Sequence, residues 1–219
     1  MEQLKRFELL VGSKNIEKIS NTKVLVLGLG GVGSYALEAI VRSGVGSVVI
    51  VDYDKIDITN LNRQLMTNHN NIGRLKTEVW KERIKDINPN CNVEVVTKKL
   101  TKEDVYELFK YQINYVIDAC DTLEVKKELI LACHKNKVKL ISSMGTGNKF
   151  DPSRLKIVDI RKTSYDPLAK KIRKFVVDNK INYKVNVVCS DELPLKLSKP
   201  IGSTAFVPAT SGLLCASFV

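Results

Sequence analysis

The chain has 219 residues, of which 44% are hydrophobic and 27% are charged. This apolar content is too high for a disordered chain, and no apolar run reaches the roughly 20 residues that span a bilayer. Charges interrupt the short apolar stretch at the N-terminus, so we expect no secretory signal. Lysine and arginine number 35 against 24 aspartate and glutamate residues, a net charge of +11. This excess suggests a polyanionic partner, or simply a basic and soluble surface.

The five cysteines argue against a scaffold built on thiols. They are odd in number, their spacing is scattered, and no C-x-x-C pair occurs. We therefore expect neither a disulfide framework nor a four-thiolate zinc site, and no zinc. The reducing cytoplasm is the expected compartment, with no membrane partner. The cysteines are Cys91, Cys120, Cys133, Cys189 and Cys215.

The strongest local pattern is a buried strand that runs into a glycine-rich turn. Residues 23–28 (KVLVLG) form a largely apolar run, the turn GLGGVG begins at Gly28, and residues 34–43 carry apolar side chains at helical spacing. Glycine permits a tight turn and lets backbone N–H groups approach a phosphate at the helix N-terminus. The pattern therefore predicts a nucleotide site. Its glycines are Gly28, Gly30, Gly31 and Gly33.

Strand-like and helix-like segments alternate as far as residue 143. This order predicts an α/β fold with a doubly wound, Rossmann-like, mostly parallel sheet, in which ligands bind beyond the carboxyl ends of the strands. After Gly145 the pattern changes, and we expect an irregular basic C-terminal extension. The expected strands are 48–52, 93–96, 115–118, 139–143, 155–160 and 185–188. The expected helices are 77–87, 102–109, 123–135 and one that begins near Thr210.

Polar residues beyond the strand ends favour ATP over a nicotinamide dinucleotide. Asp52 ends the second strand 19 residues after Gly33, a distance at which an acid can reach a ribose hydroxyl. The residues that follow can offset phosphate charge, and an acid past the fourth predicted strand can hold Mg²⁺. An NAD-dependent oxidoreductase and a non-catalytic RNA-binding module stay open as alternatives. The candidates are Asp54, Asn60, Asn62, Arg63, Gln64, Lys76, Asp121 and Thr122.

These motifs together resemble the adenylating superfamily of ubiquitin-activating enzymes and ThiF/MoeB/HesA proteins. GLGGVGS, VDYD, TNLNRQ, GRLK, INPN and DACDT occur in the order and spacing of that superfamily, over about residues 6–145. The resemblance implies that Gly31 lies against the nucleotide, that Asp52 binds the ribose and that Asp121 holds Mg²⁺. Residues 1–145 would then form an ATP-binding adenylation domain.

The resemblance also implies which residues act in catalysis. Arg63 and Lys76, together with Asn60, would bind phosphates, and with Mg²⁺ they would stabilise charge that develops on the α-phosphate. Arg6 resembles the N-terminal arginine that crosses to the ATP of a partner subunit in this superfamily. It would assist the same step, which implies a homodimer.

The C-terminal part is similar to one branch, the tRNA threonylcarbamoyladenosine dehydratases. GTGNKFDP, VDIRKT, DPLAKKIR and VCS carry this similarity, which then covers nearly the whole chain. The branch implies that ATP adenylates the carboxylate of the threonyl group on a modified adenosine next to the tRNA anticodon. Ring closure then displaces AMP with net loss of water, because AMP is a far better leaving group than oxide. The sequence itself does not decide between an AMP-forming and an ADP-forming reaction. Residues 146–219 would be the substrate- and tRNA-facing part of the same domain.

An adenylating activator of a ubiquitin-like sulfur carrier is the alternative, with a carrier or sulfur-relay protein as partner. Such activators usually have two C-x-x-C pairs that hold zinc, and this chain has none. Many also use a cysteine that takes the carrier as a thioester or persulfide, and Cys189 is the candidate here. Ring closure does not require a protein nucleophile. A catalytic role, a substrate contact and no role therefore all stay open for Cys189.

Positive charge is concentrated near the C-terminus. Residues 160–200 hold ten lysines and arginines against four acids, a net charge of +6. If these cations neutralise RNA phosphates, binding will fall steeply with salt. An amphipathic helix with Ile172 and Phe175 inward accounts for the same residues, and both hold if one face packs while the other meets phosphate. The RNA-binding candidates are Arg161, Lys162, Lys170, Lys171, Arg173 and Lys174.

Overall fold

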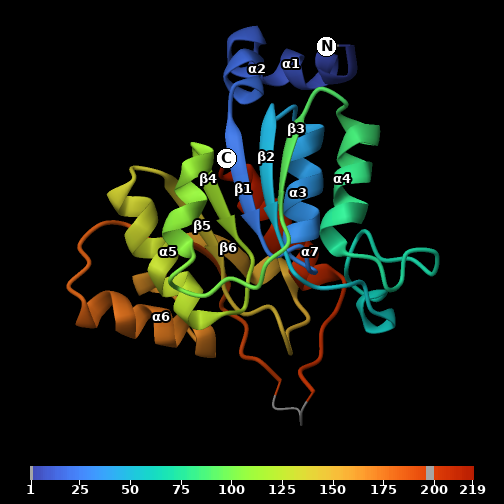
Figure 1. The fold of residues 1–219 in the computed structure, drawn as a ribbon. Coiled ribbons are helices and arrows are strands. Elements are labelled where there is room, and N and C mark those ends of the chain that lie inside the picture. Colours follow the sequence, from blue (N-terminus) through green and yellow to red (C-terminus); the bar gives the residue numbers. More distant parts are fainter. Residues whose placement is uncertain (1, 196–199) are drawn as a thin grey trace.

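The computed structural model describes residues 2–195 and 200–219 (Figure 1). Its strands form one sheet in the order β3-β2-β1-β4-β5-β7-β6. Every pairing is parallel except that of β6 with β7. The predicted doubly wound, mostly parallel sheet is therefore confirmed. The strands are β1 (Lys23–Leu27), β2 (Ser47–Val51), β3 (Asn92–Val96), β4 (Tyr115–Asp118), β5 (Lys139–Ser143), β6 (Leu155–Asp159) and β7 (Asn186–Ser190).

Helices cover both faces of the sheet (Figure 1). α3, α4 and α7 pack on one face, and α5, α6 and the 3-10 helix η3 pack on the other. The central strands β1 and β2 consist mainly of valine, leucine and isoleucine and are almost fully buried, as parallel strands with two covered faces are. The helices are α1 (Lys5–Val11), α2 (Ser13–Ser20), α3 (Gly33–Arg42), α4 (Lys76–Ile87), η3 (Val105–Tyr111), α5 (Leu123–Lys135), α6 (Pro167–Asp178) and α7 (Phe206–Ser217).

Residues 146–219 belong to the same sheet as the residues before them. β7 inserts between β5 and β6, and α7 packs closely on α3. Gly212 permits this approach, since a Cβ atom there would lie 2.2 Å from the carbonyl oxygen of Val32. The expectation of an irregular extension is not confirmed, because this part of the chain supplies two strands and two helices to the core.

Two predicted helices differ in detail from the structure. The segment expected as a helix at 102–109 forms the 3-10 helix η3 over Val105–Tyr111. The C-terminal helix begins at Phe206 rather than near Thr210. Pro208 fits into its first turn because the N–H groups there have no acceptor within the helix. In the described part of the chain, no helix has the length and apolar character that crossing a membrane requires.

Candidate active site

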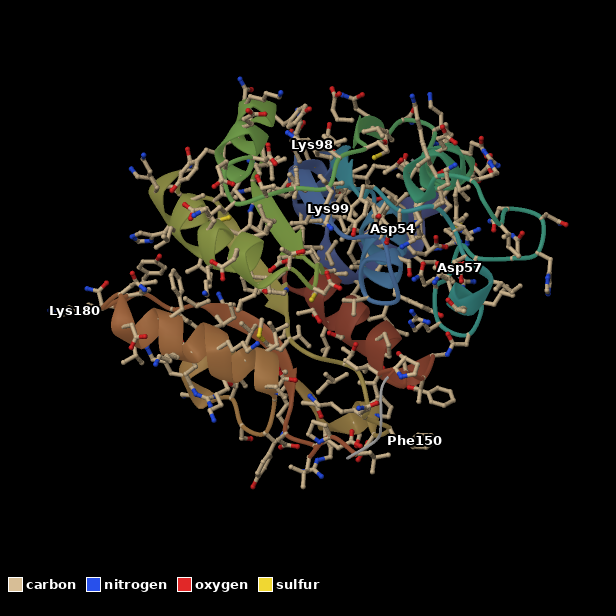
Figure 2. The ribbon with its side chains drawn as sticks, turned by 60° about the horizontal axis from the view of Figure 1, so that its bottom comes forward. Asp54, Asp57, Lys98, Lys99, Phe150 and Lys180 are labelled. Atoms are coloured by element: carbon tan, nitrogen blue, oxygen red, sulfur yellow. The ribbon has the colours of Figure 1, made fainter. Side chains whose placement is uncertain are left out.

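A cavity of about 1100 Å³ opens at the carboxyl ends of β1, β2 and β4. Figure 2 views the molecule from this end. Every residue predicted to bind the nucleotide lines the cavity except Gly33. The fold therefore brings together groups that are separated by up to about half of the chain. These lining residues are Gly28, Gly30, Gly31, Asp52, Asp54, Asn60, Asn62, Arg63, Gln64, Lys76, Asp121 and Thr122.

The glycine turn connects β1 to α3 in a tightly packed arrangement. Gly28 has a φ of +85°, and a Cβ atom there would lie 2.8 Å from the carbonyl oxygen of Ala119. A Cβ atom on Gly33 would lie 1.7 Å from the carbonyl oxygen of Gly28. Gly33 thus supports the turn from behind and does not line the cavity. The turn directs the N-terminus of α3 at the cavity, where the helix dipole favours an anion.

Asp52 is held rigidly just past the end of β2. Its side chain is 8% exposed, one carboxylate oxygen accepts the Leu29 N–H at 2.7 Å and the other accepts the Asp54 N–H at 2.8 Å. Each oxygen still has a lone pair for a second donor. The carboxylate can therefore accept hydrogen bonds from the two hydroxyls of a ribose.

Two cations face the cavity near the glycine turn. The Lys76 side chain is 7% exposed, at the first residue of α4, and its Nζ donates to Asp54 Oδ2 at 2.8 Å. Arg63 donates to the carbonyl oxygen of Thr59 at 2.9 Å and to Asn62 Oδ1 at 2.8 Å. Among the described residues no carboxylate pairs with Arg63. Its charge is therefore available to an anionic ligand.

Asp121 offers an oxygen ligand in the same cavity. It follows β4, it is exposed, and no hydrogen bond or ion pair is found for its carboxylate within the described chain. The described residues contain no group of three or more His, Cys, Asp or Glu side chains that could hold a metal ion. A metal here would need oxygens from a second source, and nucleotide phosphates provide them for Mg²⁺.

A buried polar cluster underlies this end of the sheet. Asp118, the last residue of β4, accepts the Lys126 ammonium at 2.9 Å and the Ser142 hydroxyl at 2.6 Å. Both charged side chains are 1% exposed. Nearby, burial raises the pKa of the Cys120 thiol well above its usual range. Cys120 lines the cavity as a neutral thiol rather than as a thiolate nucleophile.

Two predicted catalytic residues lie apart from the cavity. Cys189 lies in β7, is 5% exposed, and burial raises the pKa of its thiol to about 11. Its side chain therefore lies in the core and does not line the cavity. Arg6 is exposed on α1, at the end of the sheet opposite the cavity (Figure 1). Within this chain it does not line the cavity.

Sequence reasoning missed several cavity residues. Lys98 and Lys99 follow β3 and line the cavity beside Tyr53, whose ring centroid is 5.4 Å from Lys99 Nζ (Figure 2). The rule that ligands meet the carboxyl ends of strands applies to them, because the strand at 93–96 was predicted. Thr146 and Gly147 also line it; they belong to the GTGNKFDP motif, but sequence reasoning assigned them no role in the nucleotide site. Residues 200–203 line it too, and no motif in the sequence marks them.

The predicted RNA-binding cations divide into two groups. Arg161 is 3.1 Å from both carboxylate oxygens of Asp159, and Arg173 donates to the carbonyl and hydroxyl of Thr163. These two arginines therefore have internal structural partners. The four lysines are exposed, with no ion pair in the described residues, and three of them lie on α6. They are Lys162, Lys170, Lys171 and Lys174. Lys196 and Lys199, which contribute to the predicted charge excess, lie outside the described residues.

Comparison with known proteins gives consistent matches. The profile of the ThiF family matches residues 2–186. A tRNA threonylcarbamoyladenosine dehydratase of Bacillus subtilis is 42% identical over all of this chain and 93% of its own length. Two crystal structures of the Escherichia coli tRNA N6-threonylcarbamoyladenosine dehydratase match with a TM-score of 0.93 each. The structure with AMP is 35% identical and covers 99% of this chain and 92% of its own. The structure with ATP is 34% identical and covers 99% of this chain and 91% of its own.

A second kind of relative matches less of the chain. A molybdopterin-synthase adenylyltransferase of Haemophilus influenzae is 33% identical over 58% of this chain and 51% of its own length. This relative therefore matches little more than half of the chain. The dehydratases are similar to the part that contains α6, β7 and α7.

Proposed function

The chain belongs to the ThiF family and, within it, to the tRNA threonylcarbamoyladenosine dehydratases, and we propose that it dehydrates N6-threonylcarbamoyladenosine in tRNA at the expense of ATP. The threonyl carboxylate attacks the α-phosphate of ATP and releases pyrophosphate. A nitrogen or oxygen of the same group then attacks the acyl carbon, expels AMP and closes a ring. The nucleoside loses one water in total.

One observation carries this proposal: a single cavity joins the glycine turn, Asp52, Arg63 and Lys76 to the loop after β5. We place the ribose of ATP on Asp52 and the phosphates between the turn and the two cations. The volume of about 1100 Å³ leaves room beyond a nucleotide. The carboxylate substrate enters on the side of Thr146 and Gly147, which line the same cavity.

The cations of the cavity stabilise the transition state of adenylation. Negative charge grows on the α-phosphate when the carboxylate attacks, and Arg63 and Lys76 offset it through hydrogen bonds that strengthen with that charge. Arg63 contributes because no carboxylate pairs with it in the described residues. Lys76 contributes by exchanging Asp54 for a phosphate oxygen.

We include Mg²⁺ as the metal partner of ATP. Asp121 fits this group, since its carboxylate is exposed to the cavity and no partner is found for it among the described residues. Mg²⁺ typically takes one or two carboxylates together with substrate phosphates and waters. When bound, the metal supplies Lewis-acid neutralisation of phosphate charge. Asp121 holds it and orients the triphosphate.

We also include a homodimer in which Arg6 enters the partner's cavity. Within one chain α1 lies at the end of the sheet opposite the cavity (Figure 1). Leu9 and Leu10 on this helix are 84% and 81% exposed, a large apolar area for a single short helix. A second copy that covers α1 would bury these side chains and deliver the Arg6 guanidinium to a nucleotide.

The substrate base belongs to a tRNA, and α6 is the surface that meets it. Its exposed lysines have no carboxylate partners in the described residues, and the helix lies at the same end of the sheet as the cavity (Figure 2). Phosphate contacts position an RNA without reading its sequence. A tRNA-modifying enzyme of this kind is expected to act in the cytoplasm.

Mass spectrometry of tRNA nucleosides tests the proposal. The protein is incubated with ATP, Mg²⁺ and tRNA that carries threonylcarbamoyladenosine, and a second sample lacks ATP. We expect the modified nucleoside to lose the mass of one water, with one AMP formed per event, in the ATP sample alone. ATP turnover that requires a carrier protein with a Gly-Gly tail, with tRNA unchanged, would instead establish the alternative activator function.

A further inference from the structure

A second buried ion pair lies between the cavity and α6. Lys149 Nζ is 3.0 Å from Asp166 Oδ2, and the two side chains are 0% and 2% exposed. Lys149 also donates to the carbonyl oxygen of Gly145 at 2.8 Å. None of these three residues lines the cavity, and the adenylation chemistry does not use them.

On one side the pair fixes the loop after β5, two residues of which line the cavity. Gly145 follows β5 and directly precedes Thr146 and Gly147, which line the cavity. A Cβ atom on Gly145 would lie 2.4 Å from Asp166 Oδ2, so the loop backbone rests directly on the carboxylate. The position of Asp166 therefore sets the position of this part of the cavity wall.

On the other side the pair fixes the start of α6. Asp166 is the N-cap residue of this helix, and its Oδ1 accepts the Ala169 N–H at 2.7 Å. The lysines that we assign to tRNA follow within two turns, at Lys170, Lys171 and Lys174. One carboxylate thus contacts both the cavity loop and the helix that carries the phosphate-binding charges.

Stability alone does not account for such a pair. Burying two charges costs solvation free energy that their attraction barely offsets, and well-packed apolar side chains often stabilise a core as well or better. What a buried pair adds is a defined geometry, since both charges need their partners in place.

We propose that Lys149 and Asp166 are positioning residues for the tRNA substrate: they hold α6 in register with the 145–147 loop, so that an RNA bound to the helix presents its modified base to the nucleotide. This inference rests on the proposed function. It separates two uses of the same surface. The exposed lysines provide affinity for tRNA. The buried pair orients the bound tRNA so that its modified base reaches the nucleotide, and loss of the pair should therefore lower kcat rather than binding.

The test variant replaces both charges at once, Lys149→Met with Asp166→Asn. Asparagine still caps α6, and no unpaired charge stays in the core. We expect Kd values for ATP and tRNA within threefold of the wild type, and kcat for dehydration of tRNA at least tenfold lower. Gly145→Ala is an independent probe, because its methyl group displaces the Asp166 carboxylate without changing any charge. We expect it to lower kcat in the same way.

The control variant is Ile172→Val, which weakens the packing of a fully buried α6 residue and leaves the ion pair intact. It should lower the melting temperature and keep the wild-type kcat. If the double variant keeps the wild-type kcat, or if Ile172→Val lowers kcat equally, the positioning role is wrong. If the wild type itself removes no water from tRNA, the proposed function fails, which is a separate result.

Discussion

The Lys76→Met variant tests the assignment of the phosphate site most directly. Lys76 is the first residue of α4; its side chain is 7% exposed and its ammonium lies 2.8 Å from Asp54 Oδ2. A hydrogen bond between a charged donor and phosphate contributes about 1.5–3 kcal/mol, so its loss should weaken ATP binding about 10- to 150-fold. The Asp54 carboxylate, now without its cation, adds repulsion toward the triphosphate.

Calorimetric titration with ATP and Mg²⁺ measures this loss, and Lys76→Met with Asp54→Asn divides it into its parts. The double variant should regain the part of the ATP affinity that repulsion by Asp54 removes. It should still lack the part that the missing Lys76 cation provided. Folding should be little affected, because Asp54 is 46% exposed and stays solvated when unpaired. ATP affinity within twofold of the wild type in Lys76→Met, at an unchanged melting temperature, would remove Lys76 from the phosphate site.

Three further variants test other parts of the structure. Gly33→Ala should lower the melting temperature in a thermal scan by about 3–10 °C and weaken ATP binding, because the added Cβ atom would overlap the backbone of Gly28. At Gly30 a Cβ atom has room, so Gly30→Ala should leave the melting temperature unchanged. Charge reversal at Lys170 and Lys174 should weaken tRNA binding, and the slope of log K against log salt concentration should become shallower by about 1–2. As a control, charge reversal at Lys81 and Lys85, which are also exposed and four residues apart on a helix, should change neither the affinity nor the slope. Cys189→Ala should keep the wild-type kcat, and a hundredfold loss of kcat would instead establish a catalytic role. Because the pKa of the buried thiol is raised to about 11, only the unfolded state releases the thiol proton between about pH 9 and about pH 11. The wild type should therefore lose more stability than the variant as the pH rises through this range.

The nucleotide site was predictable from the sequence because its signals are local. The turn at Gly28 to Gly33 requires glycine for steric reasons that lie within a few residues, and the acid at the end of β2 follows at a fixed distance. The alternation of strands and helices then places all these segments at one end of the sheet. The resemblance to a family assigned roles to residues that this rule had already gathered.

What the sequence did not show depends on contacts between distant segments. Cys189 was the candidate cysteine of the carrier-activator alternative, and only the packing of α6 with β7 shows that it is buried. Arg161 looked available to RNA, but the chain turns it onto Asp159 and two carbonyl groups. The Lys149–Asp166 pair joins two loops whose relation is fixed by the order of β5, β7 and β6, and no periodicity in the sequence marks it.

The charge of the cavity itself leads to the prediction that ATP binds together with a divalent cation. Its described lining carries five cations and four carboxylates, a net charge of +1, which is too small to offset a triphosphate. Removing Mg²⁺ with EDTA should therefore weaken ATP binding at least tenfold in the wild type, measured by calorimetric titration. In Asp121→Asn the effect of EDTA should be smaller, because part of the metal site is already lost. Equal effects in both proteins would show that Asp121 does not hold the metal. The lining charges are Lys55, Arg63, Lys76, Lys98 and Lys99 against Asp52, Asp54, Asp57 and Asp121.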